Sequence, residues 1–300
     1  MNHFGGRVAV ITGAASGLGK AFAELAAAQG MKLVLADIQA EALESFVSTL
    51  RSRGVAVIGQ TTDVSRSEQV QALADAAMAA FGTPHLLFNN AGVLSGGLVW
   101  ESSERDWDWI LGVNVRSVIH GVRIFTPLML AAAAADPAYH GHIVNTASMA
   151  GLLNAPTLGA FNLTKHAVVS LSETLYQDLA LVTEQVHCSV LCPYFVPTGI
   201  SQSARHRPSE LASSTAPTRS QALALAQNQK ATGSAKVSAE EIARLTFEAI
   251  RRRGFYIYSH PHAMDAVRAR HEAIIRQENP PDPYANRPDL RLQLVTALHS

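Results

Sequence analysis

The most informative stretch of the sequence is Thr12-Gly13-Ala14-Ala15-Ser16-Gly17-Leu18-Gly19. It follows a short apolar run at 8–12 and leads into an amphipathic segment at 18–29, which predicts a glycine-rich turn from a strand to a helix. In such a turn, backbone N–H groups approach a pyrophosphate closely, and the helix N-terminus adds partial positive charge. The spacing G-x-x-x-G-x-G differs from the commoner G-x-G-x-x-G, and three glycines alone also suit an ordinary tight turn.

An acidic residue farther along supports a dinucleotide site. Asp37 ends the second predicted strand, at 33–37, where a carboxylate accepts hydrogen bonds from the adenosine ribose hydroxyls and repels a 2′-phosphate. Neither Ser16 nor the residues directly after Asp37 are basic. We therefore expect NAD rather than NADP as the cofactor. Asp37 would also suit the N-cap of the next helix, and this alternative stays open.

Short apolar runs alternate with amphipathic stretches along the whole chain. Seven runs are expected to form buried strands, at 8–12, 33–37, 55–60, 86–89, 143–146, 188–192 and 255–258. Helices are expected between them, near 18–29, 40–52, 66–81, 104–131, 157–182 and 239–253. This alternation predicts a single α/β domain over 1–300, with a doubly wound, Rossmann-type, seven-stranded parallel sheet and helices on both faces.

Local signals mark the ends of several predicted helices. Capping boxes are expected where a serine precedes an acidic residue by three positions, at Ser65-x-x-Glu68, Ser103-x-x-Asp106 and Ser238-x-x-Glu241. Glycines are expected just beyond helix C-termini, at Gly30, Gly54, Gly82 and Gly254.

Composition excludes several classes of protein. Lys+Arg and Asp+Glu number 24 each, so the net charge does not favour nucleic acid as a partner. No apolar run reaches the roughly 18–20 residues that span a bilayer, and Met1-Asn2-His3-Phe4 lacks signal-peptide character, so we expect no membrane association and a cytoplasmic location. Cys188 and Cys192 would lie roughly 13 Å apart on one strand, too far for a disulfide. No pair of histidines or cysteines has metal-ligand spacing, and we predict no metal.

Two segments depart from the alternation. Residues 201–236 are rich in Ser, Ala, Gln and Thr and are too long for an ordinary connection, so they form either a mobile lid or a disordered excursion. Their position after the sixth strand favours a substrate lid. Residues 277–300 carry four prolines before a short apolar end. We expect this C-terminal tail to pack on a neighbouring subunit or on the lid.

With these motifs, residues 5–260 resemble the short-chain dehydrogenase/reductase family. The similar stretches are 12–19, Thr62-Asp63-Val64, Asn89-Asn90-Ala91-Gly92 and Cys192-Pro193-Tyr194-Phe195-Val196-Pro197-Thr198. Tyr194 replaces a glycine common in the family, which should narrow the pocket. The resemblance implies cofactor contacts from Gly13, Ser16, Gly17, Leu18, Gly19, Asp37, Asp63, Val64, Asn90, Ala91, Gly92, Lys165, Pro193, Val196 and Thr198.

The resemblance also implies a catalytic Asn, Ser, Tyr and Lys. Asn114, Ser148 and Lys165 match three of them, but Phe161 stands four residues before Lys165, where the family has tyrosine. In the family's chemistry this tyrosine exchanges a proton with the substrate oxygen, the lysine favours its phenolate, the serine binds the same oxygen, and the asparagine holds a relaying water. Loss of a positioned acid/base costs about 10²–10⁴ in rate, so we expect slow turnover.

Phe161 has two explanations. The chain is either a naturally non-catalytic relative or an active enzyme whose tyrosine was changed by one substitution. The joint presence of Asn114, Ser148 and Lys165 favours the substitution. Taken singly, each of these residues has a plain structural explanation, as a helix kink, a strand-end cap and a solvated helix lysine.

The leading hypothesis is an NAD-dependent oxidoreductase for a hydrophobic secondary alcohol/ketone pair. Loop position indicates an apolar substrate side that includes Leu153, Leu158, Tyr194 and Phe195, although these residues would also suit the core. The resemblance adds Ser148 as a substrate contact. The alternatives are a non-catalytic NAD-binding scaffold or sensor, and hydride chemistry whose proton comes from water or the substrate. The resemblance further implies a homotetramer, with the helices at 104–131 and 157–182 packed between subunits.

Overall fold

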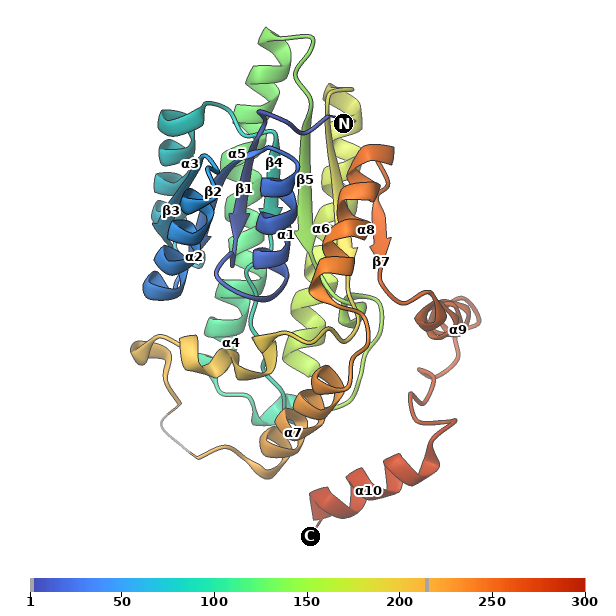
Figure 1. The fold of residues 1–300 in the computed structure, drawn as a ribbon. Coiled ribbons are helices and arrows are strands. Elements are labelled where there is room, and N and C mark those ends of the chain that lie inside the picture. The colour runs from blue at the N-terminus through green and yellow to red at the C-terminus, as the bar shows by residue number, and fades with distance from the viewer. Residues whose placement is uncertain (1–2, 214–215, 300) are drawn as a thin grey trace.

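A seven-stranded parallel sheet forms the centre of the computed structural model, which describes residues 3–213 and 216–299 (Figure 1). The strand order is β3-β2-β1-β4-β5-β6-β7, and every neighbouring pair is parallel. The predicted strands are confirmed, with ends shifted by no more than two residues. They are β1 (Val8–Thr12), β2 (Lys32–Asp37), β3 (Val57–Thr61), β4 (Leu86–Asn89), β5 (Gly141–Thr146), β6 (Val186–Cys192) and β7 (Tyr256–Tyr258).

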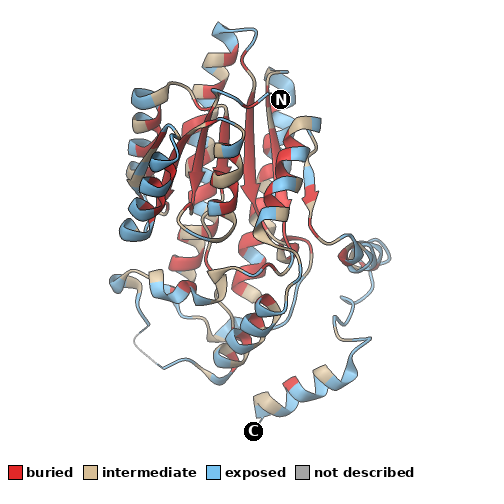
Figure 2. Ribbon diagram, in the orientation of Figure 1, coloured by how far each residue is buried: buried red, intermediate tan, exposed pale blue. Residues whose placement is uncertain are grey.

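Helices cover both faces of the sheet, as predicted. On one face the core joins the sheet to α1 (Gly17–Ala28), α2 (Ala40–Ser52) and α8 (Ala239–Arg252). On the other face it joins the sheet to α3 (Ser67–Phe81), α5 (Ser117–Ala135) and α6 (Gly159–Val182). The strands are buried on both sides while the outer edges of the helices are exposed (Figure 2). This burial explains why the strands are near-continuous apolar runs rather than alternating ones.

The predicted helix ends are confirmed in part. Ser103 and Asp106 form the full capping box of α4 (Glu104–Leu111). The box expected at Ser65 is wrong, because α3 begins at Ser67 and the Ser65 hydroxyl instead donates to Asp63 at 2.6 Å. At the end of α8 the left-handed residue is Arg253, with φ +57°, and not the expected Gly254.

Residues 104–135 form one helical run, longer than predicted. It consists of α4, a π-helical turn, η2 (Gly112–Arg116), and α5. Contrary to the sequence-based expectation, this run is long and apolar enough to cross a bilayer by length and composition alone. In the fold, however, Ile124, Phe125 and Met129 belong to the core beneath the sheet. Part of the apolar composition therefore serves the core, and 39% of the apolar window is buried inside the fold.

Segment 201–236 is more regular than its composition predicts. It contains most of the 3-10 helix η4 (Gly199–His206), then η5 (Ser209–Leu211) and α7 (Arg219–Gly233), with residues 214–215 outside the described part. The chain then returns to the sheet and ends in an extension that we call the C-terminal arm, residues 261–299. It comprises η6 (Pro261–Ala263), α9 (Met264–Ile275) and α10 (Pro288–His299), and α10 contacts α7. The last residue of the predicted tail, 300, lies outside the described residues.

Candidate active site

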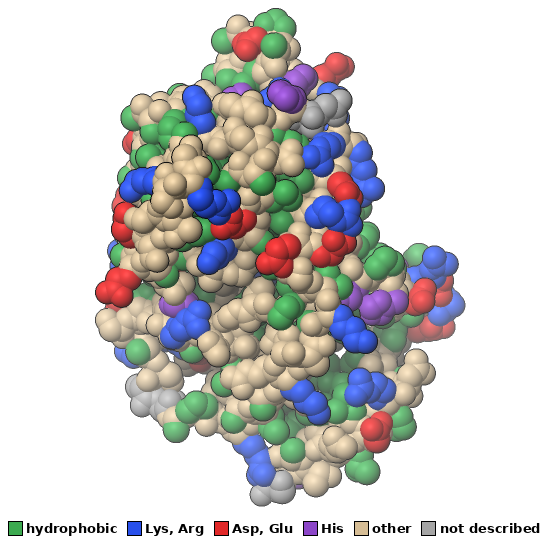
Figure 3. Space-filling view, in the orientation of Figure 1, with side chains coloured by type: hydrophobic (Ala, Val, Ile, Leu, Met, Phe, Trp, Pro, Cys, Tyr) green, Lys and Arg blue, Asp and Glu red, His purple; other side chains and the backbone are tan. Residues whose placement is uncertain are grey.

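A cavity of about 1050 Å³ opens at the carboxyl ends of the strands. It begins at the neighbouring strands β1 and β4, where the strand order reverses direction, which is the position where open α/β sheets bind ligands. Residues from α7 and the C-terminal arm close its far end. In the space-filling view, a hollow with hydrophobic side chains in its depth lies between the main body and the arm (Figure 3). The cavity therefore has a sheet half and an arm half.

The glycine-rich turn forms the floor of the sheet half. Gly13 and Gly17 have φ of +66° and +52°, which residues with a side chain rarely adopt. A Cβ on Gly13 would stand 2.9 Å from the Ala91 Cα, and one on Gly19 would stand 2.0 Å from the Gly13 carbonyl oxygen. These contacts require glycine. Gly13 and Gly17 line the cavity, whereas Gly19 is buried behind the turn and allows α1 to pack closely.

Asp37 is not the N-cap of α2, because that position is taken by Gln39, whose side chain makes no cap hydrogen bond. The Oδ2 of Asp37 accepts a hydrogen bond from the Ala15 N–H at 2.9 Å, and its Oδ1 accepts one from the Gln39 N–H at 3.0 Å at the start of α2. The carboxylate also lines the cavity. Because two carboxylate oxygens can accept about four hydrogen bonds, Asp37 keeps capacity for ribose hydroxyls.

The loops after β3 and β4 form the walls of the same half. Asn90 ties β4 to β1, since its Nδ2 donates to the Thr12 carbonyl at 3.0 Å and its N–H donates to the Thr12 hydroxyl at 2.9 Å. The other predicted cofactor contacts on the cavity lining are Ser16, Leu18, Asp63, Val64, Ala91, Gly92, Lys165, Pro193, Val196 and Thr198. An open glycine cradle at a helix N-terminus, with a carboxylate at the ribose position, fits a nicotinamide dinucleotide.

Asn114 lies on the π-helical turn and is buried. Its Oδ1 accepts from the Val93 N–H at 2.8 Å, and its Nδ2 donates to the Val93 carbonyl at 2.9 Å and to the Thr164 hydroxyl at 3.1 Å. The side chain thus fixes the loop after β4 against α6, and it does not line the cavity. The π-turn interrupts the regular helical hydrogen bonding at this position.

Ser148 and Lys165 meet the cavity at the end of β5. The Ser148 hydroxyl accepts from the Ala150 N–H at 3.2 Å and donates to the Pro193 carbonyl at 3.3 Å. Lys165 is 3% exposed and donates to the Thr146 carbonyl at 2.9 Å. Burial lowers the pKa of Lys165 to about 8. Lys165 is therefore not a solvated helix lysine, so the plain structural explanation of this residue is wrong.

Phe161 lines the cavity one turn before Lys165 on α6. The Lys165 ammonium lies 5.7 Å from the centre of the Phe161 ring. The ring packs in a cluster with Val93, Trp109 and Ile110. The structure therefore places a phenyl ring, without a hydroxyl, next to the buried lysine and at the boundary between the two halves of the cavity.

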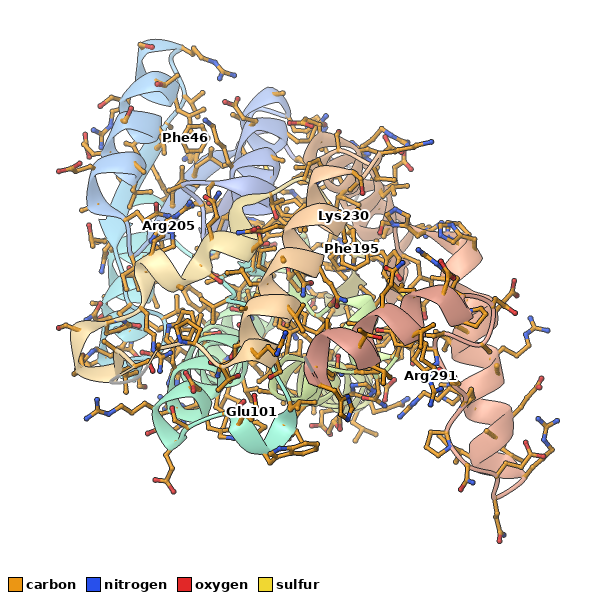
Figure 4. All side chains as sticks on the ribbon, turned by 90° about the horizontal axis from the view of Figure 1, so that it is seen from below. Phe46, Glu101, Phe195, Arg205, Lys230 and Arg291 are labelled. Atoms are coloured by element: carbon orange, nitrogen blue, oxygen red, sulfur yellow. The ribbon has the colours of Figure 1, made fainter. Side chains whose placement is uncertain are left out.

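The arm half is largely apolar. Tyr194 and Phe195 have ring centres 4.5 Å apart and form one wall, and Phe195 lies beside α7 in the view from below (Figure 4). Leu153 and Leu158 line the cavity as predicted. No sequence pattern indicated the other lining residues of this half, which come from distant segments: Leu94, Trp109, Ile200, Leu211, Ala266, Ala269 and Ile274. Among the described residues, no group of three His, Cys, Asp or Glu side chains could hold a metal ion.

Comparison with known proteins identifies the family. Residues 7–209 match the short chain dehydrogenase family. The chain belongs to the short-chain dehydrogenases. This membership places it among oxidoreductases that use NAD or NADP, and it agrees with the sheet order, the glycine turn and the buried Lys165.

Three similar proteins match almost the whole chain. A crystal structure of a short chain dehydrogenase/reductase from Burkholderia phymatum in complex with NAD is 57% identical, with a TM-score of 0.92 over 94% of this chain and 99% of that chain. A CLA biosynthesis dehydrogenase/reductase from Lactiplantibacillus plantarum is 32% identical over 93% of this chain and 97% of the relative. A C alpha-dehydrogenase from Sphingobium is 31% identical over 92% and 87%.

Proposed function

We propose that this short-chain dehydrogenase is built to interconvert a hydrophobic secondary alcohol and its ketone with NAD, and that Phe161 makes the reaction slow in this chain. One observation carries the proposal: Ser148, Phe161 and Lys165 line the same cavity as the glycine turn and Asp37, and the far half of that cavity is apolar. The names of the dehydrogenase relatives support alcohol/ketone chemistry.

NAD is favoured over NADP by the buried carboxylate of Asp37, which is 5% exposed in the part of the cavity beside the glycine turn. A 2′-phosphate on the ribose would bring a second negative charge next to this carboxylate. The NAD in the Burkholderia structure supports the same choice.

The roles of the residues follow from their positions. The nicotinamide, when bound, supplies the acceptor or donor of a hydride. The Ser148 hydroxyl can exchange its long 3.3 Å bond to the Pro193 carbonyl for a bond to the substrate oxygen. Lys165 brings an ammonium group to the same place. Phe161 contributes ring contact but no proton, so the substrate oxygen lacks an acid/base on α6.

Replacement of Phe161 by tyrosine tests the proposal. We expect Phe161→Tyr to raise the rate of NADH formation from hydrophobic secondary alcohols by about 10²–10⁴-fold, the usual contribution of a positioned acid/base. Phe81→Tyr, a matched change on α3 away from the cavity, should have no effect. If Phe161→Tyr stays inert across a broad panel while NAD binds normally, the chain is a binding scaffold rather than an enzyme.

A further inference from the structure

Two basic residues from a distant segment face the sheet half of the cavity. Arg205 and His206 lie at the end of η4 and line the cavity together with Gly17 and Asp37, although more than 160 residues separate them from that pair. In the view from below, Arg205 lies on the side of η4 opposite to α7 and towards α1 and α2 (Figure 4). The sequence indicated no basic group beside Ser16 or Asp37, but the fold brings one there.

The guanidinium of Arg205 is held close to the N-terminus of α1. Its Nη2 lies 3.0 Å from the position that a Cβ on Gly199 would take. The adjoining residue, Thr198, has its Cβ 3.2 Å from the Cβ position on Gly17, the first residue of α1. Gly199 and Thr198 thus connect the guanidinium to the first residue of α1, and Arg205 and Gly17 line the same cavity.

The neighbours of Arg205 orient it without neutralising it. Its Nε donates to His206 Nε2 at 2.6 Å and its Nη1 donates to Gln202 Oε1 at 2.6 Å. None of the ion pairs between described residues includes Arg205. Burial and the charge of Arg205 lower the pKa of His206, while Asp37 raises it, so a neutral imidazole accepts from the arginine. The guanidinium charge is therefore available to an anion.

The segment that carries Arg205 is fixed across the cavity at several points. The Ser203 hydroxyl accepts from the Leu94 N–H at 2.9 Å. Arg207 pairs with Asp106 at 2.5 Å in a largely buried position, and Glu210 of η5 pairs with Arg66 at 3.3 Å. These anchors connect the segment to the loop after β4, to α4 and to the residue before α3. They hold η4 over the sheet half of the cavity, so Arg205 needs little rearrangement to contact a ligand there.

We propose that Arg205 binds the pyrophosphate of the dinucleotide from the side of the cavity opposite the N-terminus of α1. The inference rests on the dinucleotide site of the proposed function. The charges in the sheet half support the proposal. Asp37 and Asp63 line this half near the turn and repel phosphate, so a bound pyrophosphate needs a positive group such as Arg205 close to it. A guanidinium offers two parallel donors to phosphate oxygens, which an ammonium cannot do.

The test compares Arg205→Gln with Lys230→Gln, which removes the same charge from an exposed position of α7 outside the cavity. Calorimetric titration of the full chain with NAD, ADP-ribose and adenosine needs no turnover. We expect Arg205→Gln to weaken NAD and ADP-ribose about tenfold and to leave adenosine within about twofold, since adenosine lacks phosphate. Arg205→Lys should recover part of the affinity, and Lys230→Gln should change nothing. The loss should shrink at high salt, because the charge is exposed.

Other outcomes overturn the inference. Equal weakening of adenosine and ADP-ribose would mean that Arg205 only supports the fold of η4. Unchanged ADP-ribose affinity would exclude a phosphate contact. A selective loss of NADP affinity with NAD unaffected would place the guanidinium on a 2′-phosphate instead. If the unmodified chain binds neither NAD nor ADP-ribose, the dinucleotide site itself fails, whereas a failure of Phe161→Tyr to restore activity leaves this result intact.

Discussion

Lys165 carries its ammonium group into the interior beside a ring that cannot accept a proton. Burial lowers its pKa to about 8, and its hydrogen bond to the Thr146 carbonyl fixes its position. A tyrosine at position 161 would place a phenol near this cation. Since an opposite charge close by favours the ionised form of an acid, Lys165 should lower the pKa of that phenol.

The position of Lys165 next to residue 161 predicts the pH dependence of the Phe161→Tyr variant. In the Phe161→Tyr background, Lys165→Met should lower the rate of alcohol oxidation by about tenfold or more near neutral pH and shift the rising limb of the pH profile upward, by about 1–3 pH units. Rates measured from about pH 6 to 10 test this. Lys165→Arg, which keeps the charge, is the control. An unchanged pH profile in Lys165→Met would show that the lysine has only a structural role.

Asp37 predicts the cofactor preference. Asp37→Asn keeps an acceptor for the Ala15 N–H but removes the charge, so NADP affinity should rise relative to NAD by about tenfold. Asp37→Ala should also reduce the preference for NAD over NADP. Because it leaves the Ala15 N–H without its partner, it should in addition lower the free energy of unfolding by about 1–3 kcal/mol. Calorimetry with both cofactors and thermal melts separate the two effects. Tighter binding of NADP than NAD by the unmodified chain would contradict the prediction.

At the residue scale, the sequence predicted those groups that lie next to a motif. Gly13, Asp37, Ser148 and Lys165 follow strands or repeat a family spacing, and they line one cavity. Arg205 could not be predicted in the same way. It reaches the site through the path of η4, which depends on tertiary contacts rather than on neighbours in the chain.

At the scale of elements, the failures have physical causes. Ser65 does not cap α3 because the nearby Asp63 carboxylate binds its hydroxyl and its N–H. Segment 201–236 forms α7 in spite of its polar composition because Thr218 and Gln221 form a capping box at the N-terminus of α7, which is also anchored from outside. Glu101 accepts from the hydroxyls of Thr218 and Ser220, both at 2.5 Å. Neither contact is visible from local sequence.

The lid function of 201–236 stays a prediction, and the anchor of α7 offers a way to test it. Glu101→Ala removes the acceptor for both hydroxyls at the start of α7 and should loosen this helix. We expect faster amide hydrogen exchange in 219–233 and a higher KM for substrate, while NAD affinity changes little. In the unmodified chain, exchange in 201–236 should slow when cofactor and substrate bind. Equal protection with and without ligands would mean that the segment is permanent structure rather than a lid.

At the scale of the whole molecule, alternation of strands and helices was sufficient to predict the sheet. The sequence did not indicate the C-terminal arm as a wall of the cavity. Its helices are mostly exposed (Figure 2), and α9 meets the cavity through small residues such as Ala266 and Ala269. Small apolar residues such as these form no distinctive sequence pattern, so the sequence could not predict that α9 closes the arm half of the cavity.

Buried histidines at the amino ends of the strands predict how stability depends on pH. His142 lies in the sheet, 1% exposed, and burial lowers its pKa to about 3, while burial lowers the pKa of His187 beside it to about 4. An unfolded histidine has a pKa near 6.5. Their contribution to stability is therefore fully present above about pH 6.5 and is lost as the pH falls towards 4 and 3, because the unfolded state binds more protons.

Each of these histidines can add a slope of up to about 1.4 kcal/mol per pH unit between those limits. Denaturant unfolding from about pH 8 to pH 4 measures it. In His142→Gln, unfolding should take up as much as one proton fewer, so the free energy of unfolding should change less steeply with pH. The variant should also be less stable at pH 8, because the contact with the Ser189 hydroxyl changes. His299→Gln, at an exposed position of α10, should leave the slope unaltered. A flat stability curve for the unmodified chain would contradict the assignment.

A homotetramer is predicted from the family resemblance together with the exposed surfaces of α5 and α6. Ile119 on α5 and Leu163 on α6 are 41% and 49% exposed, and Leu181 near the end of α6 is 83% exposed. Large apolar side chains left on the helices that the family packs between subunits favour a homotetramer, because burying them in an interface removes apolar surface from water. Light scattering at micromolar concentration should give about four times the 32.0 kDa chain mass. Ile119→Glu combined with Leu163→Glu should reduce this mass, since a charge in an apolar interface is costly, whereas Met78→Glu on α3 should not. A monomer mass for the unmodified chain would refute the prediction and leave the exposed apolar residues of α5 and α6 without an interface.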